Sequence, residues 1–297
     1  MTLLRPVAGL LCAAALVASA QAADKATPDF SGLWARTSLS YERPLTGRGP
    51  IENRNRRPNG ASNLSQLTGD YADPILKPEA AEVLRKRGEV WRTGEAFPQP
   101  SNQCLPYPPP YISSGNQEIQ LLQEKNRVTI LNMFDSQVRH VRLNAQHPAR
   151  VTPSWYGDSV GHYEGDTLVV DTVGIKVGPL SMVDIYGTPF SPALHVVERF
   201  RLVDAATAKT YAERGEAENG VVAGLNGDGV EINPNQDKGL QLTITVEDPG
   251  VFNQPWSGTV TYRRPLADWA EMVCAENTHE YYAGKETAIP VAAKPDF

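Results

Sequence analysis

Apolar and polar residues alternate in a series of short segments along the second two-thirds of the chain. A period of two is typical of a β-strand with one buried face. Gly, Asp and Pro separate the segments, and the long helical crossovers that a parallel sheet requires are missing. The pattern therefore predicts a mainly β fold, an antiparallel β-barrel or sandwich. The segments expected as strands are 119–134, 136–144, 155–174, 193–204, 209–218, 240–249 and 257–266.

The first third of the chain lacks this alternation. We expect a short strand at Asp29–Arg36 and then an extended arm, residues 40–74, that is rich in Pro, Gly, Asn and Arg. The arginines of the arm are expected to lie in water or to pair with the acidic body. One short surface helix is predicted over Lys77–Trp91, with acids early, bases late and Gly88 as its stop. Residues 97–115 are rich in proline and predict a rigid strap.

The N-terminus has the zones of a secretory signal peptide. Arg5 precedes an apolar run, and small residues end the segment at Ala22. The run is too short to span a bilayer, although retention as an anchor is the alternative. The sequence thus predicts a periplasmic or secreted protein. Its expected parts are a signal peptide at 1–22, an N-terminal region at 23–115, a barrel domain at 116–284 with a loop at 213–239, and a tail at 285–297.

The cysteines and the net charge refine this picture. Cleavage would leave Cys104 and Cys274, which are expected to form a disulfide in an oxidising compartment; a reactive thiol or metal pair is the alternative. The formal net charge is −6, which argues against nucleic acid as a partner. The sequence contains no P-loop, no dinucleotide fingerprint and no H-E-x-x-H, so we predict no cofactor and no metal site.

The segment Trp155–Gly174, WYGDSVGHYEGDTLVVDTVG, holds the candidate chemistry. It predicts a β-hairpin with Asp158, His162 and Asp171 on one face and with the small residues Gly157, Ser159 and Gly161 on the other. A turn at Glu164-Gly165 would place Asp158 directly opposite Asp171, which is unfavourable unless a cation or a shared proton compensates. A turn at Gly165-Asp166 is the alternative and leaves the faces unchanged. These three residues are our catalytic candidates. The alternative is an ordinary hairpin whose polar face is solvated, and the pattern leaves open which face is buried.

Several further residues are candidates for substrate binding. They are Tyr156, His147, His195, His279 and Trp155. His195 precedes Glu198 by three residues, which in a strand puts the two on opposite faces and argues against a shared metal. A lone histidine is more often a hydrogen-bonded structural residue than a catalyst, so each of these remains a hypothesis.

Longer motifs point to a family. The segments PSWYGDSVGHYEGDTLVVDTVG, YGTPFSPALHVVERFRLVD, TVEDPGVF, PWSGTVTYRR and VCAENTHEYYAG resemble those of a family of exported bacterial proteins with a G-H-W/Y-E-G-D-T-L-V-V-D-T core and a C-terminal V-C-x-E-N. The resemblance covers most of the chain from DFSGLW onward. A departure is Phe190, where the family pattern has histidine, so no role of that histidine is carried over. The resemblance implies export, with lipocalin-like barrels as the nearest architectural analogy.

Two hypotheses of function follow. The first is a cofactor-independent enzyme, a lyase, isomerase or hydrolase, that moves protons on a hydrophobic or aromatic small molecule in a barrel cavity. The second is a periplasmic binding or carrier protein in which the same groups orient a ligand. A third interpretation is a homo-oligomer in which the arm, residues 40–74, clasps a neighbour.

Overall fold

The computed structural model describes residues 27–93, 100, 104–116, 118–134, 136–178, 180–221 and 230–268. These residues form a nine-stranded sheet, two α-helices and a 3-10 helix. The strands are β1 (Gly32–Trp34), β2 (Ile119–Gln123), β3 (Arg127–Asn132), β4 (Gln137–Leu143), β5 (Asp158–Glu164), β6 (Thr167–Val173), β7 (His195–Asp204), β8 (Lys238–Glu247) and β9 (Trp256–Tyr262). The helices are α1 (Pro78–Arg92), η2 (Tyr111–Ser114) and α2 (Ala205–Asn219).

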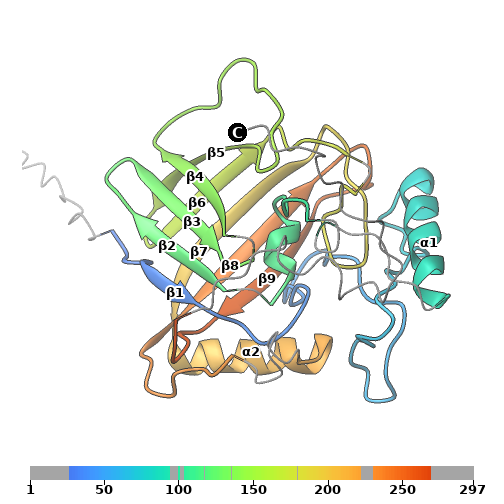
Figure 1. Ribbon diagram of the computed structural model, residues 1–297, viewed down its shortest axis with the longest axis horizontal. Coiled ribbons are helices and arrows are strands. Elements are labelled where there is room, and N and C mark those ends of the chain that lie inside the picture. The colour runs from blue at the N-terminus through green and yellow to red at the C-terminus, as the bar shows by residue number, and fades with distance from the viewer. Residues whose placement is uncertain are drawn as a thin grey trace, which may run out of the picture.

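The sheet is nearly closed into a barrel, which confirms the predicted fold class (Figure 1). The spatial order of the strands follows the chain, from β1 to β9. A bridge between Ala35 and Arg263 brings the chain after β1 back to the chain after β9. All neighbouring strands are antiparallel except β4 and β5, which are parallel. The connection between these two strands must therefore return along the sheet, and residues 144–157 do so as an irregular loop.

Alternation along each strand separates an inward face from an outward one. On β6, Leu168, Val170 and Thr172 are completely buried, whereas the residues between them face outward. The inward face also holds a buried ion pair, in which Arg139 of β4 binds both carboxylate oxygens of Glu198 of β7 at 2.5 and 2.9 Å. The proline-rich strap joins the core, since all four residues of η2 are buried. Apolar burial is the main stabilising contribution here.

The predicted surface helix is present as α1, but Gly88 does not end it. The buried stripe of α1 is Ala80, Leu84 and Gly88, at intervals of four residues. A Cβ atom at Gly88 would lie 2.3 Å from Cγ2 of Thr68, which is too close for a real contact. Gly88 therefore lets the arm approach the helix rather than stopping the helix.

Two predictions for residues 205–221 are wrong. Residues 209–218, expected as a strand, lie in α2, and so does the beginning of the loop predicted at 213–239. Asp204 caps this helix, because its carboxylate accepts a hydrogen bond from the Thr207 backbone N–H at 2.8 Å. The buried side is narrow and made of small residues, so α2 packs closely against β8 and β9. A Cβ atom at Gly239 of β8 would lie 2.3 Å from the Cβ atom of Ala208.

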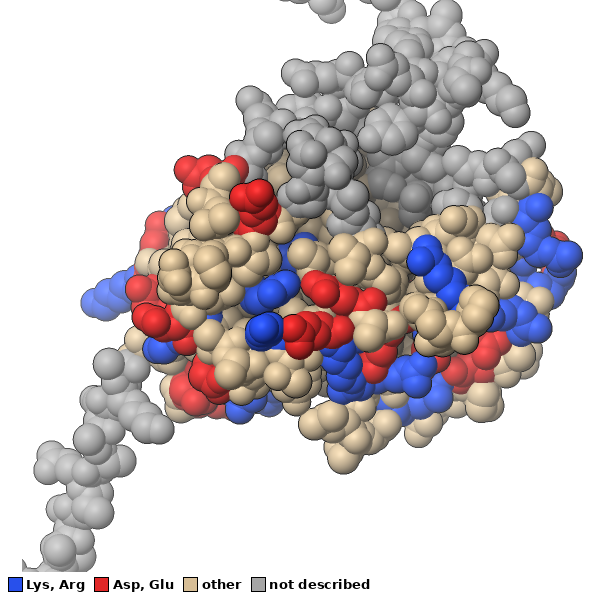
Figure 2. All heavy atoms as spheres, turned by 90° about the horizontal axis from the view of Figure 1, so that it is seen from below, with Lys and Arg blue, Asp and Glu red and all other residues tan. Residues whose placement is uncertain are grey.

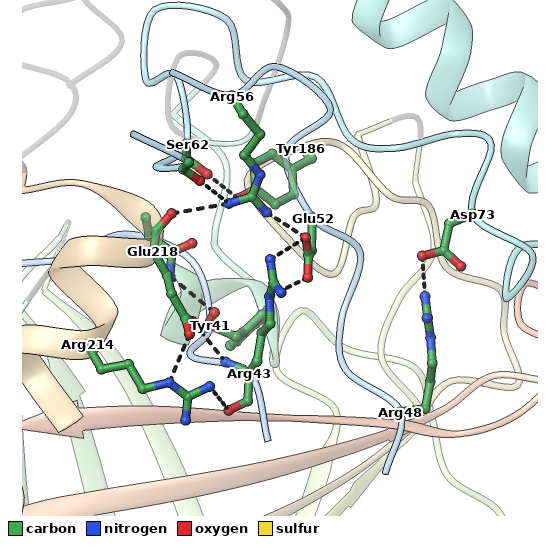
Figure 3. Close-up of polar contacts among 12 residues, drawn as sticks. Tyr41, Arg43, Arg48, Glu52, Arg56, Ser62, Asp73, Tyr186, Arg214 and Glu218 are labelled. Carbon is green, nitrogen blue, oxygen red and sulfur yellow. Dashed lines mark hydrogen bonds and ion pairs between the residues drawn. The ribbon is translucent and has the colours of Figure 1, made fainter. Parts of the chain in front are cut away.

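The arm folds onto its own barrel and onto α2 (Figure 3). Glu52 pairs with both Arg43 and Arg56, and Arg56 also donates a hydrogen bond to the Glu218 carbonyl of α2 at 3.3 Å. Arg48 pairs with Asp73 within the arm. The acidic partners in these ion pairs belong to the arm itself, whereas pairing with the acidic body was expected. Self-association through the arm stays a prediction.

Some predicted features lie outside the described residues. They are the signal peptide, Cys274, His279 and the tail at 285–297. The disulfide between Cys104 and Cys274 therefore stays a prediction. Among the described helices, none combines the length and the apolar character needed to cross a membrane.

Candidate functional site

The hairpin of β5 and β6 uses the second of the two turn positions expected from the sequence. Its turn is Gly165-Asp166, with Gly165 at a φ of 63°, and Glu164 pairs with Thr167. Consequently Asp158 lies opposite Val173 and Asp171 opposite Val160, so the predicted direct pairing of Asp158 with Asp171 is wrong. The assignment of faces is unaffected by this shift. Moving the turn by one residue changes the cross-strand partner of each residue by two positions, and residues two positions apart in a strand lie on the same face. Asp158 and Asp171 remain on one face as diagonal neighbours.

The acidic face of the hairpin is the outer face of the barrel. Ser159 and Gly161 of β5 point inward with Leu168, Val170 and Thr172 of β6. The acids therefore do not line the barrel interior, as the cavity hypothesis assumed. They do not lie in open water either, since the side chains of Asp158 and Asp171 are 17% and 39% exposed. The outward-facing Val160 and Val169 beside them are nearly buried, at 9% and 4%.

Charged and histidine side chains form a row across this end of the outer face. Strands β4 to β8 each contribute one residue, and the loop 144–157 adds His147 between β5 and β6. We call this set the acid–base row. In spatial order it consists of Arg142, Asp158, His147, Asp171, His195 and Glu247. Bases and acids alternate along the whole row, so each group has a partner of the opposite kind.

His147 joins the two aspartates. Its Nδ1 atom lies 2.6 Å from Asp158 Oδ1, and its Nε2 atom lies 3.1 Å from Asp171 Oδ1. An ionised carboxylate only accepts hydrogen bonds, so both bonds form only when both ring nitrogens carry a proton. The ring of His147 therefore bridges the two acidic side chains through its two nitrogens. It provides a hydrogen-bonding partner between two neighbouring strand acids.

Asp171 is shared between two imidazole rings. The same oxygen, Oδ1, also lies 3.0 Å from Nε2 of His195 on the neighbouring strand β7. The other ring nitrogen of His195 faces Glu247 Oε2 at 3.7 Å, an ion-pair distance that is too long for a hydrogen bond. Nδ1 of His195 thus makes no hydrogen bond within the described residues, and this nitrogen is available to exchange a proton with a bound molecule.

Arg142 holds the other end of the row. Its guanidinium group donates two hydrogen bonds to Asp158, at 2.7 and 2.9 Å. These bonds lower the pKa of Asp158, and the hydrogen bond from His147 lowers it further against the opposing effect of partial burial. Asp158 is therefore held as a carboxylate, the form that accepts a hydrogen bond from His147 Nδ1.

The row brings together four of the predicted site residues and leaves others apart. Asp158, Asp171, His147 and His195 belong to it. His162 does not, because its exposed ring binds Glu164 at 3.0 Å near the turn. Tyr156 donates its hydroxyl proton to Gln137 Oε1 at 2.9 Å, and the ring of Trp155 lies 4.8 Å from Lys176 Nζ. As predicted, Glu198 faces inward while His195 faces outward.

Arg142 and Glu247 were missed by the sequence analysis. Alternation along β4 and β8 places both outward, but only the register of five strands shows that they lie beside the aspartates. His195 and Glu247 are direct cross-strand partners, whereas Arg142 meets Asp158 through the one parallel pair. No short-range signal in the sequence contains this information.

Two shallow hollows lie at the opposite end of β7 and β8. They measure about 440 and about 290 Å³ and share Leu202, Asp237 and Lys238 in their walls. Neither includes a residue of the acid–base row. We assign more functional weight to the row, because chemistry depends on its hydrogen-bonded groups rather than on open volume. Within the described ranges, no three His, Cys, Asp or Glu side chains are arranged as metal ligands.

Comparisons with family models, with curated proteins and with solved structures found no match for this chain. The resemblance to an exported bacterial family therefore stays a prediction.

Proposed function

We propose that the protein is an exported enzyme that transfers protons on a hydrophobic or aromatic small molecule, without a cofactor, at the acid–base row. The reaction would be an elimination, isomerisation or hydrolysis, which are the reactions that a positioned acid and base accelerate. The observation that carries this proposal is the sharing of Asp171 Oδ1 by two imidazole rings. A row of alternating donors and acceptors can pass a proton from one member to the next.

The roles of the residues follow from their positions. His195 acts as the base or acid that touches the substrate, because one of its ring nitrogens makes no hydrogen bond at 3.5 Å or less within the described residues. Asp171 orients that ring and stabilises the imidazolium ion that forms when His195 takes a proton. In the free protein, His147 contacts the same oxygen of Asp171 from the opposite side. Such positioned acid–base catalysis contributes about 10²–10⁴-fold in rate.

The number of charged groups in the row also favours an enzyme over a carrier protein. A carrier that only orients a ligand needs few charged groups, whereas the row places two carboxylates and two imidazoles in partial burial, with the exposed Glu247 beside them. Arranging so many titratable groups in mutual contact is characteristic of sites that do chemistry.

The test uses small molecules from a native extract. The purified mature protein is incubated with the extract, and mass spectrometry follows which compounds disappear or appear. We expect wild type to convert a compound and Asp171→Asn to convert it at least about 100-fold more slowly. The matched control is His162→Gln, which alters an exposed imidazole–carboxylate pair on the same face and should behave as wild type.

Two results would overturn the proposal. One is a compound that wild type retains without conversion, which identifies a carrier. The other is conversion that Asp171→Asn carries out as fast as wild type, which places the chemistry away from the acid–base row.

A further inference from the structure

The ring of His147 occupies a gap between two carboxylates that the sheet itself holds in place. Asp158 and Asp171 are fixed on the adjacent strands β5 and β6, and Arg142 of β4 clamps Asp158 from the other side. The ring, in contrast, comes from the irregular loop 144–157. The sheet thus provides two carboxylate oxygens, and the loop provides the ring between them.

The loop can release this ring without disturbing the sheet. Its backbone hydrogen bonds to the strands lie at its two ends, at Asn144 and at Ser154. Residues 148–150 and 152–154 are exposed. Between the ends, the loop is held by the His147 ring, by a long hydrogen bond from Arg142 to the Gln146 carbonyl at 3.4 Å, and by Val151 against Gly174. Opening of such a loop costs far less than global unfolding.

Removal of the ring would leave a site with excess negative charge. Asp158, Asp171 and Glu247 then face one arginine, Arg142, and one imidazole, His195. A partly buried site with this balance attracts a cation. Asp158 Oδ1 and Asp171 Oδ1 keep their contacts with Arg142 and His195, and the lone pair that each would have free favours a cation with two N–H groups in one plane.

We infer that the gap between Asp158 and Asp171 is a substrate subsite for a flat cation with two N–H donors, such as an aromatic amidine, and that His147 fills it when the loop is closed. This inference rests on the proposed function and deepens it, because it names the polar part of the substrate. An amidinium group and an imidazolium ring both present two planar N–H donors on nitrogens joined to one carbon. An amidinium that enters the gap would meet the same two oxygens and would lie beside His195, the proposed base.

Calorimetric titration with benzamidine tests the inference at neutral pH. The His147→Ala variant empties the gap, and we expect it to bind benzamidine about tenfold or more tightly than wild type does, because the ligand no longer competes with the ring. Benzamide, which has the same shape without the charge, should bind at least about tenfold more weakly than benzamidine to this variant. The second substitution Asp171→Asn, made in His147→Ala, should abolish the difference between the two ligands.

His162→Ala is the matched control, because it removes an imidazole that pairs with an exposed carboxylate on the same face. It should bind benzamidine no better than wild type. Should His147→Ala not fold, wild type provides the second measurement, since saturating benzamidine should increase amide hydrogen exchange in residues 144–157.

Three outcomes would overturn the subsite: equal binding of benzamidine and benzamide, binding that does not depend on Asp171, or unchanged exchange of the loop in wild type at saturation. Its failure is distinct from failure of the proposed function. Conversion of an extract compound that requires Asp171, together with no amidine binding, would reject the substrate class and keep the acid–base function.

Discussion

At the scale of single residues, Asp171 is the centre of the site. Its Oδ1 atom lies within 3.1 Å of two imidazole nitrogens that come from different segments of the chain. Asp158 has a more electrostatic role, since Arg142 keeps it ionised and it in turn fixes the His147 ring. The two aspartates therefore differ in role. Asp171 is shared by two imidazole rings, and Asp158 fixes the position of one of them.

Asp158 should contribute stability in a pH-dependent way. Its pKa is lowered in the folded protein, so its contribution is present above its unfolded pKa, about 3.9, and is lost as the pH falls through the folded value. We expect Asp158→Asn to lower the free energy of unfolding by about 1–2 kcal/mol near neutral pH. Urea denaturation from pH 7 down to about pH 3 should show the difference from wild type shrinking below about pH 4. A difference that grows with acidity would contradict this role.

The buried pair Arg139–Glu198 should matter more for stability than any pair of the outer face. Glu198 is completely buried and Arg139 is 5% exposed, so removing one partner leaves a charge without compensation. We expect Glu198→Ala to cost about 3–5 kcal/mol in urea denaturation. The exposed pair Arg199–Glu164 serves as control, and Glu164→Ala should cost less than about 1 kcal/mol. Similar losses of unfolding free energy in the two variants would contradict the larger contribution of the buried pair to stability.

At the scale of elements, sequence patterns predict strands better than they predict contacts. The period of two identified the hairpin of β5 and β6 and both of its faces, because alternation survives a shift of register. The same pattern failed at residues 209–218, where Asp204 as a helix cap and Ala208 and Ala212 at a spacing of four are the signals that indicate α2. These local signals favour a helix, whereas the strands on both sides favoured the prediction of another strand.

The acid–base row could be predicted only in part for a related reason. Asp158 and Asp171 share a hairpin, so their proximity follows from local sequence. His147 reaches them through an irregular loop, and its position depends on the parallel pairing of β4 with β5. Arg142 and Glu247 require the register of the whole sheet. Long-range pairing of this kind leaves no periodic trace in a single sequence.

A glycine in α1 offers a test of close packing between elements. Replacing glycine by alanine inside a helix ordinarily stabilises a protein by up to about 1 kcal/mol. At Gly88 we expect the opposite, because the new Cβ atom would lie 2.3 Å from Cγ2 of Thr68. Gly88→Ala should lower the melting temperature, and the double variant Gly88→Ala/Thr68→Ser, which removes that methyl group, should recover most of the loss. A stabilised single variant would show that the arm does not press against α1 at this position.

At the scale of the whole molecule, residues 38–76 pack against the barrel and the end of α2. Figure 2 views the molecule from below the orientation of Figure 1. Acidic and basic side chains are interspersed over this face, in keeping with the small net charge of −6. Ion pairs of the arm with itself and its hydrogen bonds to α2 hold this segment in place (Figure 3). The acid–base row, at one end of the outer face, is built from the strands and a loop of the barrel.

Because the arm is folded, trypsin should cut it slowly despite its arginines. Cleavage requires a locally unfolded segment, so its rate follows the opening of the arm. We expect Glu52→Gln, which removes the shared partner of Arg43 and Arg56, to raise the rate of cleavage after Arg54 and Arg56 several-fold. The control Glu82→Gln alters an ion pair within α1 and should leave that rate unchanged. Rapid cleavage of wild type at these arginines would contradict a docked arm.

The measurement that tests the central claim most directly is ¹⁵N nuclear magnetic resonance of the histidine rings in wild type and Asp171→Asn. If Asp171 is shared, the single substitution changes the ring ¹⁵N shifts of His147 and His195 together, while those of His162 stay the same. A substitution that changes only one of the two rings, or neither, would show that the acid–base row does not act as a unit.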